Sequence, residues 1–113
     1  MGSSLTTHVL DTARGVPAEG VIITLAEERG AVWIERGVFT TNADGRVGAL
    51  LPDGELSVGR WRLRFDVASY FVGHGLPCFF PYAELVFDVT ELTRHHHVPL
   101  LVSPFGYSTY RGS

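Results

Sequence analysis

Histidines and a tyrosine-rich C-terminal segment are the residues of this sequence best suited to chemistry. His8 lies in a short N-terminal run, His95, His96 and His97 are consecutive, and residues 107–113 read Tyr-Ser-Thr-Tyr-Arg-Gly-Ser. Imidazole exchanges protons near neutral pH, so a pair of these side chains suits general acid–base catalysis. Because side chains alternate along a strand, His95 and His97 are expected on one face and His96 on the other.

A His-x-His pair on one strand face also supplies half of a zinc site. The third ligand would have to come from elsewhere in the chain, and His8 is the available histidine. No second cluster of strong metal ligands is visible in the sequence. A zinc hydrolase therefore stands as an alternative beside a metal-free paired-imidazole site, and structural histidines remain the third interpretation.

A tight turn singles out one arginine. Residues 42–45, Asn-Ala-Asp-Gly, are typical of a chain reversal, and Arg46 follows them directly. This position can direct the guanidinium at a pocket, where its planar fork suits an anionic ligand rich in carbonyl groups. The single cysteine, Cys78, has no basic neighbour in sequence and is a poor candidate for a nucleophile.

Strands must position these groups, because the dominant hydropathy period is two. Residues 20–28 and 31–41 predict a hairpin, with Gly30 between them. Residues 60–65 alternate strictly, which directs three aromatic and aliphatic side chains to a core and three arginines to the opposite face. The core-facing residues are Trp61, Leu63 and Phe65, and the arginines are Arg60, Arg62 and Arg64.

The second half of the chain predicts one helix and further strands. Asp66 as an N-cap, with glycines ending the segment at Gly73 and Gly75, favours one or two helical turns. Further strands are expected over residues 83–90, 95–103 and 107–110, and a proline-containing loop over 76–83. The predicted fold is mainly β: an antiparallel two-sheet β-sandwich with one short helix.

Length and composition limit the classes of function. The 113 residues predict one domain over residues 1–113, and one cysteine excludes an internal disulfide framework. Nine arginines, no lysine and twelve carboxylates give a net charge of −3, which argues against nucleic acid or an anionic membrane as a partner. No secretory signal or bilayer-length apolar segment is visible, so we expect a soluble, cytoplasmic protein.

Three motifs in order along nearly the whole chain resemble the transthyretin-related 5-hydroxyisourate hydrolases. The first is Leu-Thr-Thr-His-Val-Leu-Asp-Thr over residues 5–12, followed by Gly-Val-Pro-Ala over 15–18. The second is the Asp-Gly-Arg turn at 44–46, and the third joins residues 97–104 to the final Tyr-Arg-Gly-Ser. That final motif separates the hydrolases from transthyretin, the hormone carrier. His96 departs from the His-Tyr-His that the family more often shows, and we do not expect this change to abolish activity.

The resemblance implies a transthyretin-like sandwich that forms a homotetramer, a dimer of dimers, with active sites in the channel where the dimers meet. The implied reaction opens the ring of 5-hydroxyisourate, a small-molecule substrate, to 2-oxo-4-hydroxy-4-carboxy-5-ureidoimidazoline in urate degradation. No cofactor and no metal are implied. Catalytic roles carry over to His8, Arg46 and His97, and substrate-site roles to the tail residues Tyr110, Arg111, Gly112 and Ser113.

The sequence leaves the division of labour between the histidines open. Hydrolysis of a cyclic amide needs a base for water and donors for the oxyanion. Either His8 or His97 can be the base, and Arg46 can hold the planar ring. We favour His8 as the group that activates water, with His97 orienting it. A transthyretin-type carrier that binds small molecules without chemistry is the rival from another class.

Overall fold

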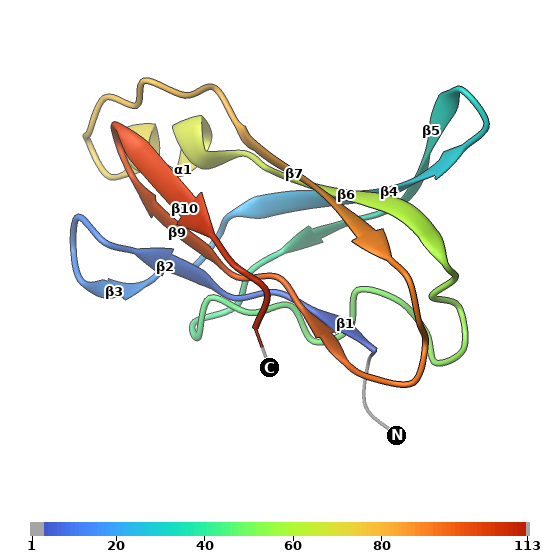
Figure 1. Ribbon diagram of the computed structural model, residues 1–113. Helices are drawn as coiled ribbons and strands as arrows, with labels where there is room; N and C mark the ends of the chain where they lie inside the picture. The colour runs from blue at the N-terminus through green and yellow to red at the C-terminus, as the bar shows by residue number, and fades with distance from the viewer. Residues whose placement is uncertain (1–3, 113) are drawn as a thin grey trace.

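Two β-sheets pack against one another in the computed structural model, which describes residues 4–112 (Figure 1). One sheet has the strand order β10-β9-β2-β3 and the other β5-β4-β6-β7, while β1 and β8 pair with each other alone. The elements of the described residues are β1 (Leu5–Thr6), β2 (Val9–Asp11), β3 (Val16–Pro17), β4 (Ile22–Arg29), β5 (Val32–Thr40), β6 (Gly59–Phe65), α1 (Val67–Gly73), β7 (Ala83–Val89), β8 (His96–His97), β9 (Leu100–Ser103) and β10 (Gly106–Thr109).

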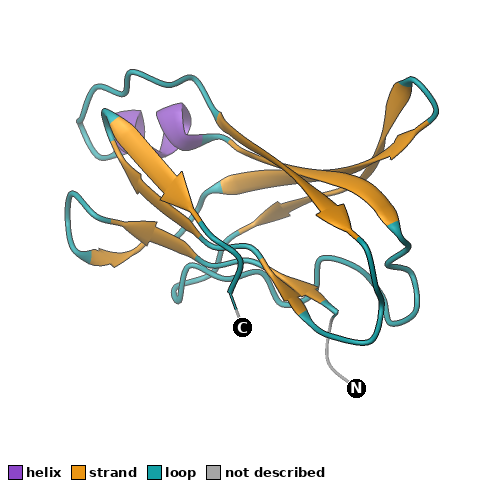
Figure 2. Ribbon diagram, in the orientation of Figure 1, coloured by secondary structure: helices purple, strands orange, loops and turns teal. Residues whose placement is uncertain are grey.

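The predicted sandwich with one short helix is confirmed (Figure 2). β4 and β5 form the expected hairpin, and Asp66 caps α1 by accepting a hydrogen bond from Ser69 N. The strand expected over residues 95–103 is divided into β8 and β9, because Pro99 between them has no N–H to donate to a ladder. The helix α1 is too short to cross a membrane, and the described residues contain no other helix.

Two pairings are parallel and bring the N-terminal strands beside the histidine run. β1 pairs with β8, which places Thr6 opposite His97. β2 pairs with β9, so a parallel pair lies inside an otherwise antiparallel sheet. Hydrogen bonds continue the line between these short strands: Val98 N donates to Thr6 O at 2.9 Å, and Leu100 N donates to His8 O at 2.9 Å. The two histidine-bearing segments therefore run side by side.

The alternating strand β6 supplies the centre of the core, as its pattern predicts. Trp61, Leu63 and Phe65 are fully buried. On the opposite face the Arg62 guanidinium lies 4.6 Å from the centroid of the Trp33 ring, and that of Arg64 lies 3.7 Å from the Tyr82 ring. These arginines thus cover aromatic side chains in the manner of cation–π pairs rather than facing solvent alone.

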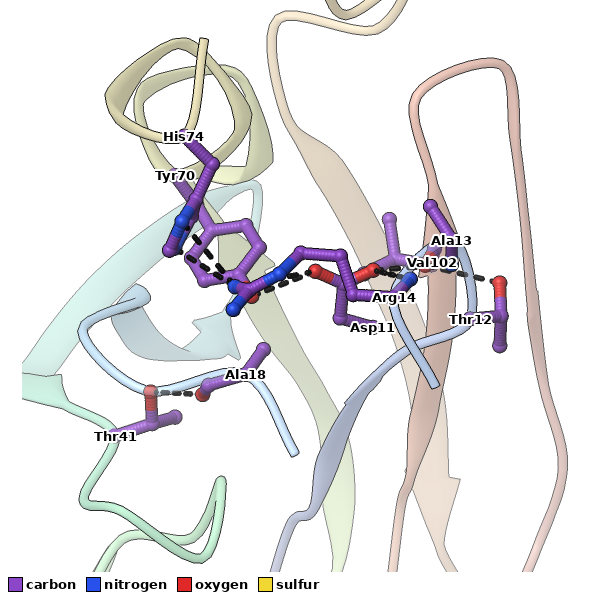
Figure 3. Close-up of polar contacts among 9 residues, drawn as sticks. All are labelled: Asp11, Thr12, Ala13, Arg14, Ala18, Thr41, Tyr70, His74 and Val102. Atoms are coloured by element: carbon purple, nitrogen blue, oxygen red, sulfur yellow. Dashed lines mark hydrogen bonds and ion pairs between the residues drawn. The ribbon is translucent and has the colours of Figure 1, made fainter. Parts of the chain in front are cut away.

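A buried carboxylate fixes β2 to the helix (Figure 3). Tyr70 on α1 donates its hydroxyl to Asp11 Oδ2 at 2.7 Å, and the backbone N–H groups of Ala13 and Arg14 donate to Asp11 Oδ1, each at 3.0 Å. Burial, followed by the hydrogen bond to Asp11, raises the pKa of Tyr70 to about 12, so the phenol stays a donor at neutral pH. The anchored strand begins directly after His8, which it therefore helps to position.

Candidate active site

The backbones of His8 and Arg46 lie side by side. The two residues form an isolated antiparallel bridge, and Val9 N donates to Gly45 O at 2.8 Å. Gly45 has φ +74°, and a Cβ at this position would collide with the Val9 carbonyl oxygen. Only glycine therefore allows the turn to approach β2 closely enough to bring the Arg46 backbone beside His8.

The side chain of Asn42 holds the turn that presents Arg46. Its Oδ1 accepts hydrogen bonds from Asp44 N at 2.9 Å and from Arg46 N at 3.1 Å. The backbone closes the same loop, because Asn42 N donates to Arg46 O at 2.8 Å. An Asx-type turn of this kind can be read from the sequence, whereas the partner strand that it approaches cannot.

His97 meets the same region from β8. Its Nδ1 lies 2.8 Å from Thr6 Oγ1, across the parallel β1–β8 pair. The charges of both Arg46 and His8 act on the imidazole of His97. The structure therefore brings together the three residues expected to be catalytic, His8, Arg46 and His97. Sequence reasoning gave Thr6 no role, because a lone threonine carries no motif signal.

Both imidazoles are held in the neutral form. Burial is the main cause that lowers the pKa of His8, followed by the positive charge of Arg46. The pKa of His97 is lowered by the same two causes in the same order, and then by His95 and His8. Because both values lie below the ordinary 6.5, each ring carries a free nitrogen lone pair at neutral pH. Either ring can then accept a proton from water.

The C-terminal segment packs directly on His97. Gly112 N donates to His97 O at 2.8 Å, and a Cβ at position 112 would overlap the imidazole ring. Tyr110 and Arg111 line a cavity of about 250 Å³ together with His97. Tyr110, Arg111 and Gly112, which the resemblance places in the substrate site, thus lie beside His97, and Ser113 lies outside the described residues.

The remaining two histidines of the run differ in environment. His95 is exposed, its Nε2 lies 2.7 Å from Thr6 Oγ1, and its ring stacks over that of His97 with centroids 6.4 Å apart. His96 is only 5% exposed, and its Nδ1 has no hydrogen-bond partner. It also lines the cavity of about 250 Å³ beside His97, so the residue that departs from the family pattern borders the site.

A sequence profile described as the HIUase/Transthyretin family matches residues 5–112. The chain belongs to this family. A 5-hydroxyisourate hydrolase from Mus musculus is 46% identical over 98% of this chain and 96% of its own length.

Solved structures of the HIUase/Transthyretin family have the same fold. The 5-hydroxyisourate hydrolase of Klebsiella pneumoniae is 37% identical with a TM-score of 0.82 over 100% of both chains. Sea bream transthyretin in complex with thyroxine is 31% identical with a TM-score of 0.92, over 96% of this chain and 94% of that one. The chain also matches an (S)-allantoin synthase at 40% identity and a TM-score of 0.89, covering 96% of itself but only 43% of that longer chain.

The zinc alternative lacks an assembled set of ligands in this HIUase/Transthyretin family member. Across residues 4–112, no three His, Cys, Asp or Glu side chains are grouped so that they could hold a metal ion. His95 and His97 instead direct one ring nitrogen each at the Thr6 hydroxyl.

Replacing His96 by phenylalanine is expected to weaken the dependence of stability on pH. Burial, followed by the charge of Arg111, lowers the pKa of His96, and the pKa values of His8 and His97 are lowered as well. Below about pH 6.5 the unfolded chain therefore binds protons that the folded chain does not, and the free energy of unfolding falls as the pH falls. His96→Phe removes one such site. It also removes a buried nitrogen that has no hydrogen-bond partner, and such an unpaired group destabilises the folded chain by about 1–3 kcal/mol.

Urea unfolding at pH 7.5 and pH 5.5, at one protein concentration, measures this effect. The variant should lose less stability than the wild type between the two pH values. An equal or larger loss in His96→Phe would show that His96 is not one of the groups responsible.

Proposed function

We propose that this chain is a hydrolase that opens the ring of 5-hydroxyisourate in urate degradation, without a cofactor. The product is 2-oxo-4-hydroxy-4-carboxy-5-ureidoimidazoline. The observation that carries the proposal is the convergence of His8, Arg46 and His97 on one region, with Gly112 of the C-terminal segment against the His97 ring. Relatives named 5-hydroxyisourate hydrolase, from mouse and from Klebsiella pneumoniae, support the same activity.

The three groups suit the hydrolysis of a cyclic amide. Water must lose a proton as its oxygen attacks the carbonyl carbon, and the carbonyl oxygen gains negative charge. We assign the proton to His8, whose residue pairs with Arg46 at the end of the turn, and the orientation of water to His97. Arg46 binds the planar ring and stabilises the negative oxygen through its fork of donors. The ring C–N bond then breaks as its nitrogen takes up a proton.

The C-terminal segment forms one wall of the proposed site. Tyr110 and Arg111 line the cavity beside His97, while Gly112 allows the backbone to lie against the imidazole. We include Ser113, the next residue, in the substrate site on the resemblance alone. A carrier that only binds small molecules has no need of two neutral imidazoles paired with a guanidinium, although the likeness to thyroxine-bound transthyretin keeps binding without catalysis as the second candidate.

A homotetramer, formed as a dimer of dimers, completes the proposal. Strands β7 and β10 are edges of the two sheets, and residues from both line one cavity. Exposed apolar side chains lie on or near these edges at Val86, Tyr107 and Tyr110. Unpaired edges of this kind are commonly covered by a second chain. The mass in solution, measured by light scattering, should be that of four chains, and a monomer would contradict the assembly.

The decay of 5-hydroxyisourate tests the activity directly. The compound is generated in place from urate with a urate oxidase, and its ultraviolet band is followed with and without this protein. Decay faster than the spontaneous rate, and unchanged by a chelator, is the expected result. A folded protein with no effect on the decay would overturn the hydrolase and favour the carrier, and activity lost to the chelator and restored by zinc would favour a zinc hydrolase.

A tag fused after Ser113 is expected to lower turnover by about tenfold or more, because a displacement of about 1 Å in an active site can cost about 100-fold. Residue 112 already contacts His97, so added residues start at the edge of the site. The same tag placed before Met1 is the control and should leave turnover near that of the untagged protein. Equal activity of the two fusions would contradict a positioned C-terminal segment.

A further inference from the structure

One hydroxyl group serves two imidazoles beside the proposed site. Thr6 Oγ1 lies 2.7 Å from His95 Nε2 and 2.8 Å from His97 Nδ1, and the two rings are close to parallel at 22°. Both distances are in the range of hydrogen bonds. Thr6 is half-buried, and its backbone pairs with β8. The residue that carries this hydroxyl is therefore positioned by a strand pairing rather than by a loop.

A hydroxyl has one proton, so the two contacts cannot have the same polarity when Thr6 donates. If Thr6 donates to His95 Nε2, it accepts from His97 Nδ1–H, and His97 Nε2 keeps its lone pair. If Thr6 accepts from His95 Nε2–H, its own proton is available for His97 Nδ1, and when it donates there the proton of neutral His97 is on Nε2. The first arrangement gives His97 an acceptor at Nε2, and the second gives it a donor.

We propose that Thr6 and His95 are positioning residues that together select the tautomer of His97. In the arrangement that we assign to the active site, Thr6 donates to His95 Nε2 and accepts from His97 Nδ1–H. His95 thereby directs the hydroxyl proton away from His97, and His97 Nε2 keeps a lone pair that can accept a hydrogen from water. The opposite arrangement would place the proton on His97 Nε2, which could then no longer accept from water.

The charges around the pair do not replace this link. Arg46 and His8 act on His97 from the turn and from β2, and His95 acts on it from the same segment. The charges of Arg111, Glu91, His95 and Arg94 act on the neighbouring His96. These charges change the proton affinity of His97, and a hydrogen bond to the Thr6 backbone raises its pKa, whereas the contact of the Thr6 hydroxyl with Nδ1 bears on which of the two nitrogens is protonated. The expected effect on activity rests on the proposed function, whereas the expected effect on the tautomer of His97 does not depend on it.

Thr6→Val is the deciding variant, because valine has the shape of threonine without the hydroxyl. We expect kcat to fall about tenfold or more, less than the 10²–10⁴-fold that a proton-transfer group itself is worth, while KM changes less than about threefold. Thr6→Ser should recover most of the activity. Thr7→Val is the matched control, since the neighbouring Thr7 hydroxyl donates to Val98 O at 2.6 Å and touches neither imidazole.

A double-mutant cycle separates joint positioning from two independent structural roles. If Thr6 and His95 act through one chain of hydrogen bonds, Thr6→Val combined with His95→Gln should lose no more kcat than Thr6→Val alone. Losses that multiply in the double variant, or a Thr6→Val enzyme that Thr6→Ser fails to restore, would overturn the proposal.

Nitrogen NMR of histidine-labelled protein tests the tautomer without substrate. At neutral pH the His97 signals of the wild type and of Thr7→Val should be those of the Nδ1–H form, and those of Thr6→Val should shift towards the Nε2–H form. A His97 tautomer that is the same in the wild type and in Thr6→Val would overturn the proposal, whatever the activity. A wild type that fails to speed the decay of 5-hydroxyisourate would instead overturn the proposed function, so the two failures are distinguishable.

Discussion

Replacing His97 by alanine is expected to lower kcat for 5-hydroxyisourate by at least about 100-fold, because the variant loses the group that orients the attacking water, and a misplacement of about 1 Å in an active site can cost about 100-fold. Thr6 lies at Nδ1 of His97 and Gly112 lies against its ring, while the charges of Arg46 and His8 act on the imidazole. Stopped-flow decay of the ultraviolet band, with the spontaneous rate subtracted, measures the effect. Light scattering on the same sample checks that the assembly is unchanged.

His74→Ala is the matched control for this variant. His74 follows α1 and contacts Arg14 and Tyr70, on elements that hold none of the proposed catalytic groups (Figure 3). It should therefore keep near-wild-type turnover. If His97→Ala kept near-native turnover in an intact assembly, the role given to His97 would be wrong, and His8 alone would have to supply the imidazole chemistry.

The strands that carry strong hydropathy patterns could be predicted from the sequence, and those that assemble the site could not. β6 alternates over six of its seven residues, which is enough for Trp61, Leu63 and Phe65 to mark a core face. β1 and β8 have two residues each, too few for any period. Their parallel pairing, which joins Thr6 to His97 across 91 positions, follows from the whole sandwich rather than from local sequence.

The same distinction explains which site residues were found. His8, Arg46 and His97 have side chains whose chemistry is visible at any position, and a resemblance to known motifs placed them together. Thr6 has an ordinary side chain, and only the distances of 2.7 and 2.8 Å to two imidazoles give it a role. Gly112 was expected as part of a tail motif, but the physical reason is a close approach of backbone to imidazole, which no spacing rule contains.

Arg46→Ala is expected to lower kcat/KM by about 10²–10³-fold, the loss typical of removing an oxyanion-stabilising donor. Arg46→Lys should recover only part of this loss, because an ammonium keeps the charge but lacks the planar fork that binds a ring edge with two donors. Arg64→Ala is the control. Arg64 lies on β6 with its guanidinium over the Tyr82 ring, on the face of that strand opposite the core, so turnover should stay near that of the wild type.

The pH profile distinguishes an electrostatic effect of Arg46 on the imidazoles from a simple loss of substrate binding. Arg46 lowers the pKa of both His8 and His97, so removing its charge raises both values. A base with a higher pKa is protonated at higher pH, and the acid limb of kcat for Arg46→Ala must therefore move to higher pH. Arg46→Lys retains the positive charge and should move it less. An acid limb that stays in place in Arg46→Ala would mean that the guanidinium does not act on either imidazole, and Arg46 would then contribute to binding of the ring alone.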